Sequence, residues 1–173
     1  MVSEFPWIVE HLGPKHDRAS FDCGVPALDD FIKKYARQNE EIDFSRTYVA
    51  RRPDSMRVVG YFSISAGQVN GADLPAEEAK RFPRYPVPVI ILGRLAVDRS
   101  VQGQRLGKGL LVRGLEKARQ VPDTVGVNAV AVFATNEAAR EFYLKHGFKP
   151  LLDDPMHLFM TLKVIRKLFG QGP

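Results

Sequence analysis

An apolar run, a glycine-rich turn and a basic amphipathic helix follow one another in the middle of the chain. The run PVPVIILGRLAVD, residues 86–98, is almost entirely aliphatic, which is typical of a central strand buried on both faces. The segment SVQGQRLGKGLL, residues 100–111, then contains three glycines, the first of which, Gly103, lies in a turn before a helix that begins near Leu106. Because a strand buried on both faces needs covering layers, this unit predicts an α/β fold with helices flanking a sheet.

The rest of the chain alternates between strand-like and helix-like patterns. Short apolar or alternating runs predict further strands at 6–12, 46–50, 57–66, 125–134 and 157–163. Helical spacing of apolar residues predicts helices over 25–38, 75–82 and 135–148. The runs at 46–50 and 57–66 are expected to form an antiparallel hairpin. With 173 residues, 45% of them hydrophobic, the chain is expected to form one domain over residues 1–173.

Composition excludes several classes of protein. No segment reaches the roughly 18 uncharged apolar residues of a membrane span, and the first residues lack the pattern of a secretory signal, so we expect a cytoplasmic protein without membrane contact. The single cysteine, Cys23, is expected to be a small buried residue, and four scattered histidines predict no metal site. A formal net charge of +5 favours an anionic partner such as nucleic acid or a phosphorylated ligand.

The glycine-rich turn is placed where an anion binds well. A strand that ends at Val97 and a helix that begins near Leu106 present backbone N–H groups at the positive end of a helix dipole, which favours a pyrophosphate. P-loop spacing is absent, since Lys108 is followed by Gly109 and not by Ser or Thr. The dinucleotide fingerprint G-x-G-x-x-G does not occur in this segment either. Glycines that only allow the turn to pack are the alternative interpretation.

Two motifs together resemble the GNAT superfamily of acetyl-CoA-dependent N-acetyltransferases. QGQRLG at 102–107 is similar to the family's pyrophosphate signature Q/R-x-x-G-x-G/A, and NEAAREFYLKHGF at 136–148 is similar to its later N-x-x-A-x-x-x-Y-x-x-x-G-F helix. The resemblance implies a single GNAT-like domain. Its central mixed, mostly antiparallel sheet is flanked by helices and splayed between the two central parallel strands.

The same resemblance implies acetyl-CoA as co-substrate and assigns roles by position. Tyr143 is the expected catalytic residue and gives its phenolic proton to the departing thiolate, whereas packing of its ring beside Phe142 is the structural alternative. The residues expected to bind acetyl-CoA are Leu95, Ala96, Val97, Gln102, Gly103, Gln104, Arg105, Gly107, Lys108 and Asn136.

One position departs from the family signature. With Gln102 in its first place and Gly107 in its last, Arg105 stands where the family has its middle glycine. A register that begins at Gln104 satisfies the letters but moves the turn two residues away from the strand. A side chain at this place either adds a charge contact to the pyrophosphate or obstructs it. The hypothesis that follows is a variant with weakened binding of acetyl-CoA.

Several further segments resemble the acetyltransferase toxins of type II toxin–antitoxin modules. They are FDCGVPALD at 21–29, RTYVA at 46–50, LGRLAVDRSVQGQ at 92–104 and FYLKHGF at 142–148. This resemblance implies acetyl transfer to the α-amino group of aminoacyl-tRNA, which blocks translation. It also implies a ribbon-helix-helix antitoxin, operator DNA bound only through the antitoxin complex, and a homodimer.

Two other functions stay open from the sequence. One is a GNAT enzyme that acts on a small amine or a protein N-terminus. The other is an antitoxin-binding and DNA-binding co-repressor with impaired catalysis. The sequence does not specify which aminoacyl-tRNA is acetylated.

The motifs contain no compelling general base, which suits an α-amino acceptor. A lysine amine with a pKa of about 10.4 needs deprotonation, whereas an α-amino group at about 7.7–8.0 is substantially neutral at cell pH. Basic residues are the candidates for contacts with tRNA phosphates, with solvated surface as the alternative interpretation. They are Arg94, Arg99, Arg113, Lys117, Arg37 and Arg46.

Overall fold

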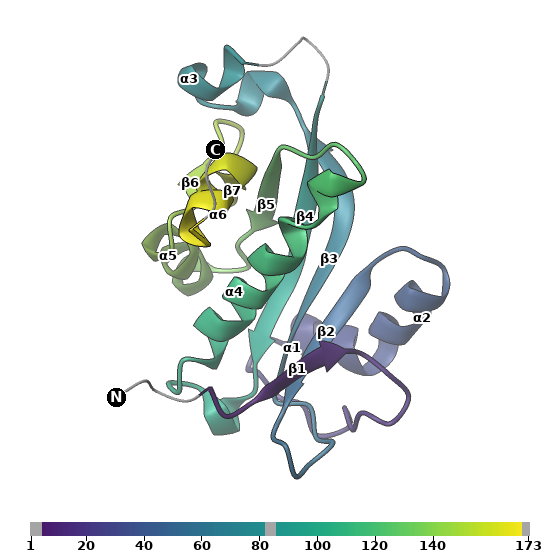
Figure 1. Cartoon of the computed structure of the whole chain (residues 1–173). Helices are drawn as coiled ribbons and strands as arrows, with labels where there is room; N and C mark the ends of the chain where they lie inside the picture. The colour runs from purple at the N-terminus through teal and green to yellow at the C-terminus, as the bar shows by residue number, and fades with distance from the viewer. Residues whose placement is uncertain (1–4, 82–85, 171–173) are drawn as a thin grey trace. The chain divides into compact units, whose positions relative to one another are not determined.

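The computed structural model describes residues 5–81 and 86–170. Within them, seven strands form one mixed sheet in the order β1-β2-β3-β4-β5-β7-β6 (Figure 1). The strands are β1 (Ile8–His11), β2 (Arg46–Arg51), β3 (Gly60–Val69), β4 (Val87–Val97), β5 (Ala129–Phe133), β6 (Lys149–Pro150) and β7 (His157–Thr161). The expected mixed, mostly antiparallel sheet is confirmed.

The strand pairs follow the sequence predictions. β2 and β3 form the expected antiparallel hairpin, with Arg46 opposite Ile64 and Ala50 opposite Gly60. β4 and β5 run parallel over Val89–Ile91 and Ala129–Ala131, and β4 continues to Val97. A parallel pair needs a long crossover connection. Here that connection contains the glycine-rich turn and the helix after it.

The described helices lie close to their predicted positions except α6 (Leu162–Leu168), which was not predicted because residues 162–163 were expected to end the last strand. They are α1 (Pro26–Asp30), α2 (Ala36–Glu41), α3 (Ala76–Ala79), α4 (Leu106–Ala118), α5 (Glu137–Lys145) and α6 (Leu162–Leu168). Residues Phe31–Tyr35 form a π-helix between α1 and α2. The last residue of the helix expected over 75–82 lies outside the described residues. No described helix has the length and apolar character needed to cross a membrane.

The chain divides into two compact units that are best described separately. In its described part, unit 1 comprises residues 5–65 and 93–114, and unit 2 comprises residues 66–81, 86–92 and 115–170. Each unit has a buried apolar cluster of its own. In unit 2 the cluster includes Val87 and Val89 of β4 and Ala129 and Ala131 of β5, and such alternate residues share one face of a sheet.

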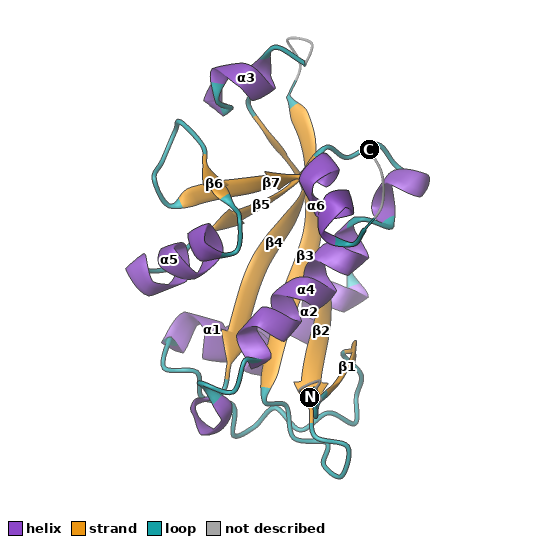
Figure 2. Ribbon diagram, turned by 60° about the vertical axis from the view of Figure 1, so that its left-hand side comes forward, coloured by secondary structure: helices purple, strands orange, loops and turns teal. Residues whose placement is uncertain are grey.

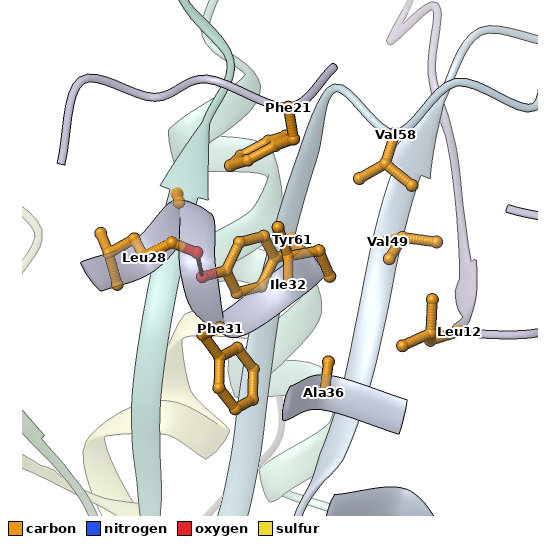
Figure 3. Close-up of a cluster of buried hydrophobic side chains, with 10 residues drawn as sticks. Leu12, Phe21, Leu28, Phe31, Ile32, Ala36, Val49, Val58 and Tyr61 are labelled. Atoms are coloured by element: carbon orange, nitrogen blue, oxygen red, sulfur yellow. Dashed lines mark hydrogen bonds between the residues drawn. The ribbon is translucent and has the colours of Figure 1, made fainter. Parts of the chain in front are cut away.

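Helices cover both faces of β3 in unit 1 (Figures 1 and 2). Gly60 faces α4, since a Cβ atom at this position would lie 2.9 Å from Leu110 Cδ1 and 3.0 Å from Leu106 Cδ2. The next residue, Tyr61, points to the opposite face, because successive side chains of a strand alternate. There its hydroxyl donates a 2.6 Å hydrogen bond to the carbonyl oxygen of Leu28 in α1 (Figure 3). The close fit at Gly60 holds the first turns of α4 against the strand.

Candidate functional site

The carboxylate of Asp98 organises the chain immediately after β4. The residue is buried, and its Oδ1 accepts hydrogen bonds from the backbone N–H of Ser100 (3.0 Å) and from the Ser100 hydroxyl (2.7 Å). Its Oδ2 accepts from the backbone N–H of Asp22 (2.9 Å), and Arg57 lies 3.3 Å from Oδ1. Burial acts to raise the pKa of Asp98, but these hydrogen bonds and the Arg57 charge lower the pKa overall. The carboxylate therefore ties the end of β4 to the loop before α1.

The side chain of Gln102 fixes the glycine-rich turn to the same two segments. Its Nε2 donates to the carbonyl oxygens of Val97 (2.9 Å) and Cys23 (3.2 Å). Cys23 is only partly buried, so the prediction of a buried cysteine is wrong in degree, and desolvation raises the pKa of its thiol to about 11. With its amide used in this way, Gln102 shapes the turn that was expected to bind acetyl-CoA.

The backbone of the turn takes the left-handed conformation at two positions. Gly103 has a φ of 81°, and Arg105 has a φ of 65° directly before the first residue of α4. For a residue with a side chain this conformation costs about 1–2 kcal/mol. Position 105, where the family signature has its middle glycine, thus requires a positive φ, which glycine adopts without strain. This agrees with the register that begins at Gln102.

A run of backbone donors is left open at the start of α4. Among the described residues, no hydrogen bond is donated by a backbone N–H from Gln102 to Lys108, while the carbonyl oxygen of Arg105 accepts from Gly109 N–H (3.2 Å). The helix that follows is 13 residues long, so its positive dipole end adds to these donors. The side chains of Arg105 and Lys108 are exposed beside them. This arrangement fits a pyrophosphate.

The second motif forms α5 and lies in unit 2. Asn136 caps the helix, with its side-chain oxygen accepting a 2.8 Å hydrogen bond from Ala139 N–H. The helix is followed by Gly147 with a φ of 96°, which confirms the expected left-handed end. Capping uses one lone pair of the Asn136 oxygen and leaves its amide nitrogen available to a ligand such as acetyl-CoA.

Tyr143 has a packed ring and an available hydroxyl. The ring lies edge-on to Phe142 and Phe148, with centroid distances of 5.3 and 5.4 Å, and the residue is only 5% exposed. The hydroxyl makes no hydrogen bond to any described residue. Burial raises the pKa of Tyr143, which keeps the phenol protonated at neutral pH. The ring therefore packs beside Phe142, as the structural alternative expected, and the catalytic role of Tyr143 stays a prediction.

Three of the arginines expected to contact tRNA are engaged within unit 1. Arg94 stacks its guanidinium 3.7 Å from the centre of the buried Phe31 ring. Arg99 pairs with Asp22 at 3.3 Å. Arg46 pairs with both Asp43 and Glu40. The charges of Arg99 and Arg46 are therefore partly compensated before any partner binds.

The other expected basic residues differ in their surroundings. Arg113 is exposed on α4, with its guanidinium 5.9 Å from the Phe5 ring, and Lys117 is exposed on the same helix. Arg37 of α2 is half-buried and forms no ion pair with a described carboxylate.

The structure thus groups most of the expected acetyl-CoA residues in unit 1, at the end of β4 and in the turn. Tyr143, Asn136 and Lys117 belong to unit 2. No cluster of three or more potential metal ligands occurs among residues 5–81 and 86–170.

Comparisons with known proteins agree with this geometry. The acetyltransferase (GNAT) family model matches residues 15–148. A tRNA-acetylating toxin of Mycobacterium tuberculosis is 40% identical over 154 residues, which cover 89% of this chain and 91% of the relative. A probable toxin TacT of Sinorhizobium fredii is 30% identical over 94% of this chain and 95% of its own length.

Several solved structures are similar to this chain over nearly its whole length. A mutant of KacT has a TM-score of 0.91 at 32% identity, with 95% of this chain and 99% of that chain covered. AtaT complexed with acetyl-methionyl-tRNAfMet has a TM-score of 0.88 at 32% identity, with 94% and 99% covered. A mutant AtaT bound to the C-terminus of the antitoxin AtaR and to acetyl-CoA has a TM-score of 0.81 at 29% identity, with 96% and 99% covered. The family match, the 40% identical relative and the shared sheet together identify this chain as a member of the GNAT acetyltransferase family.

Proposed function

We propose that this chain transfers the acetyl group of acetyl-CoA to the α-amino group of an aminoacyl-tRNA and acts as the toxin of a toxin–antitoxin pair. The observation that carries this proposal is the 40% identity to a tRNA-acetylating toxin across 89% of the chain. The similarity to AtaT in complex with an acetylated methionyl-tRNA supports the same substrate class.

Acetyl-CoA is the proposed co-substrate, and it supplies a thioester acetyl group when bound. The open N–H groups from Gln102 to Lys108 hold its pyrophosphate at the start of α4. Main-chain groups of Leu95, Ala96 and Val97 at the end of β4 orient the thioester carbonyl, and the amide nitrogen of Asn136 contacts the pantetheine. The acetyl-CoA complex of the related AtaT supports this assignment.

Tyr143 is the proposed proton donor of the reaction. As the acceptor amine forms its bond to the acetyl carbon, the carbon–sulfur bond breaks and the sulfur takes the phenolic proton. The proton lost by the amine returns to the phenolate, so the enzyme ends as it began. The raised pKa keeps this proton on Tyr143 before the reaction, and the free hydroxyl leaves it available.

Replacing Arg105 by glycine is expected to strengthen acetyl-CoA binding by about fivefold. Glycine has no Cβ to obstruct the pyrophosphate, and it adopts the positive φ of this position without strain. The same change should raise the free energy of unfolding by up to about 1 kcal/mol. Isothermal calorimetry and urea unfolding measure the two effects. Gln104→Gly is the matched control, since residue 104 does not have a positive φ. Equal acetyl-CoA affinities for the parent chain and Arg105→Gly would show that Arg105 does not obstruct the turn.

An antitoxin is the proposed protein partner. Related structures contain AtaT with AtaR, and the AtaT–AtaR complex bound to DNA. By analogy, this chain binds a ribbon-helix-helix antitoxin, contacts operator DNA only as part of that complex, forms a homodimer and acts in the cytoplasm.

The function is tested by incubation with labelled acetyl-CoA and total charged tRNA. Label is expected on the amino acid released from the tRNA by mild base, and its identity reveals which aminoacyl-tRNA is used. Label on small amines or protein N-termini alone would support a different GNAT enzyme. Absence of transfer by a chain that still binds its antitoxin and DNA would instead indicate a co-repressor.

A further inference from the structure

A shallow depression of about 260 Å³ lies in unit 1, away from the glycine-rich turn in sequence. Its lining residues come from the loop after β1 and from the π-helix: His16, Asp17, Arg18, Ala19 and Lys33. None of these five residues belongs to the two motifs of the acetyltransferase family.

The walls of the depression are held by hydrogen bonds on the loop side. His16 accepts the Gly13 N–H at Nδ1 (2.9 Å), and its Nε2 lies 2.8 Å from Glu10 Oε1. The guanidinium of Arg18 donates to the carbonyl oxygen of Ile32 at 2.8 Å, which joins the loop to the π-helix. The Asp17 carboxylate accepts from the backbone N–H of Ala19 at 3.1 Å. The site is therefore ordered before any ligand arrives.

Positive charge outweighs negative charge at this place. Among the described residues, Arg18, Lys33 and the nearby Arg37 form no salt bridge, and Asp17, which accepts from Ala19 N–H, contributes the single carboxylate that lines the depression. Burial, followed by the like charge of Arg37, lowers the pKa of Arg18. A bound anion would offset the repulsion between these two arginines.

Two other cations of unit 1, Lys34 in the π-helix and Arg46 in β2, differ in this respect. Lys34 pairs with Asp30 at 3.1 Å, and Arg46 pairs with Asp43 and Glu40. The pairing of Arg46 leaves it less suited to tRNA than the sequence indicated. The unpaired group is instead centred on the depression.

We propose that this depression binds a backbone phosphate of the tRNA substrate through Lys33 and Arg18, with Arg37 supplying additional positive charge. The inference rests on the proposed function and adds a phosphate site outside the acetyl-transfer motifs. Phosphate contacts of this kind position a nucleic acid and do not read its sequence. The site should therefore act on tRNA affinity and leave the chemistry of acetyl transfer unchanged.

The test compares two double variants that each remove two positive charges. Lys33→Gln with Arg37→Gln removes two cations of the unpaired group, and Lys34→Gln with Lys80→Gln removes two cations that are paired with carboxylates. Arg18 is left unchanged, because its bond to Ile32 supports the π-helix. Binding of deacylated tRNA, which has no amine to acetylate, is followed by fluorescence anisotropy over a series of KCl concentrations.

The first double variant is expected to bind tRNA several-fold more weakly. Its plot of log K against log salt should be shallower by about 0.7–0.9 for each phosphate contact that is lost. The control should retain the slope of the parent chain. Equal losses in the two double variants would overturn the proposal, because they would reflect net charge alone.

Two further measurements separate the remaining explanations. Inorganic phosphate, added at matched ionic strength, should compete with tRNA for the parent chain and less for the first double variant. If phosphate binding is lost while tRNA affinity is unchanged, the depression is a free-anion site and the proposal fails. Acetyl transfer to charged tRNA is measured in parallel for the parent chain and the first double variant. If the parent chain acetylates charged tRNA and the first double variant has the same KM, the phosphate site is rejected while the proposed function stands.

Discussion

Tyr143→Phe is expected to lower kcat for acetyl transfer by about 10²–10⁴-fold, the usual contribution of a positioned proton donor. The affinity for acetyl-CoA and the free energy of unfolding should change little. The reason is that the ring contacts with Phe142 and Phe148 are retained, and the hydroxyl makes no hydrogen bond to a described residue. Steady-state kinetics with charged tRNA, calorimetry with acetyl-CoA and urea unfolding provide the three measurements.

Tyr61→Phe is the matched control for this experiment. It removes the same hydroxyl group from a buried tyrosine, but here the hydroxyl donates to the Leu28 carbonyl oxygen. We expect it to lower the free energy of unfolding by about 1 kcal/mol and to leave kcat near that of the parent chain. If Tyr143→Phe leaves kcat unchanged, Tyr143 has no part in proton transfer.

Most of the sheet and α4 could be predicted because their patterns are local. The apolar residues at helical spacing after the glycine-rich turn are all buried: Leu106, Leu110, Leu111, Leu115 and Ala118. The alternating runs placed β2 and β3 in the correct hairpin, although β3 begins at Gly60 and extends to Val69. The family assignment, which came from two motifs in the correct order, is confirmed.

Features that depend on one residue or on short elements were not predictable. The π-helix at Phe31–Tyr35 is only five residues long, too short for its different period to change the apolar pattern over 25–38. The two-residue strand β6 is too short to carry an alternation. The strand predicted over 157–163 ends at Thr161, whose side chain caps α6 by accepting from Val164 N–H at 3.3 Å.

The details of the candidate site required the folded chain because its contacts join distant segments. Asp98 and Asp22 are 76 residues apart, and Gln102 and Cys23 are 79 residues apart. No local pattern indicates such pairs. The sequence therefore predicted a ligand-binding role for Gln102 but did not predict that its amide would hold the turn in place. It also gave no reason to single out Asp98.

Asp98→Ala is expected to lower the free energy of unfolding by about 3 kcal/mol, because three hydrogen-bond donors and Arg57 lose a buried acceptor. The same change should weaken acetyl-CoA binding. It removes the hydrogen bond from Asp22 N–H that joins the end of β4 to the loop before α1, and the glycine-rich turn follows directly from this end of β4. Urea unfolding and calorimetry measure the two losses. Asp54→Ala, at an exposed position in the turn between β2 and β3, is the control and should change stability by less than about 0.5 kcal/mol.

The effect of Asp98 should also depend on pH in a defined direction. The pKa of this carboxyl is lower in the folded chain than the ordinary value of about 3.9, so its ionised form is favoured by folding. Its contribution is complete above that ordinary value and is lost as the pH falls through the folded pKa. The difference in stability between the parent chain and Asp98→Ala should therefore be constant from about pH 7 to about pH 5 and should shrink below about pH 4. A difference that stays constant at acid pH would mean that packing of the side chain, and not its charge, stabilises this corner of unit 1.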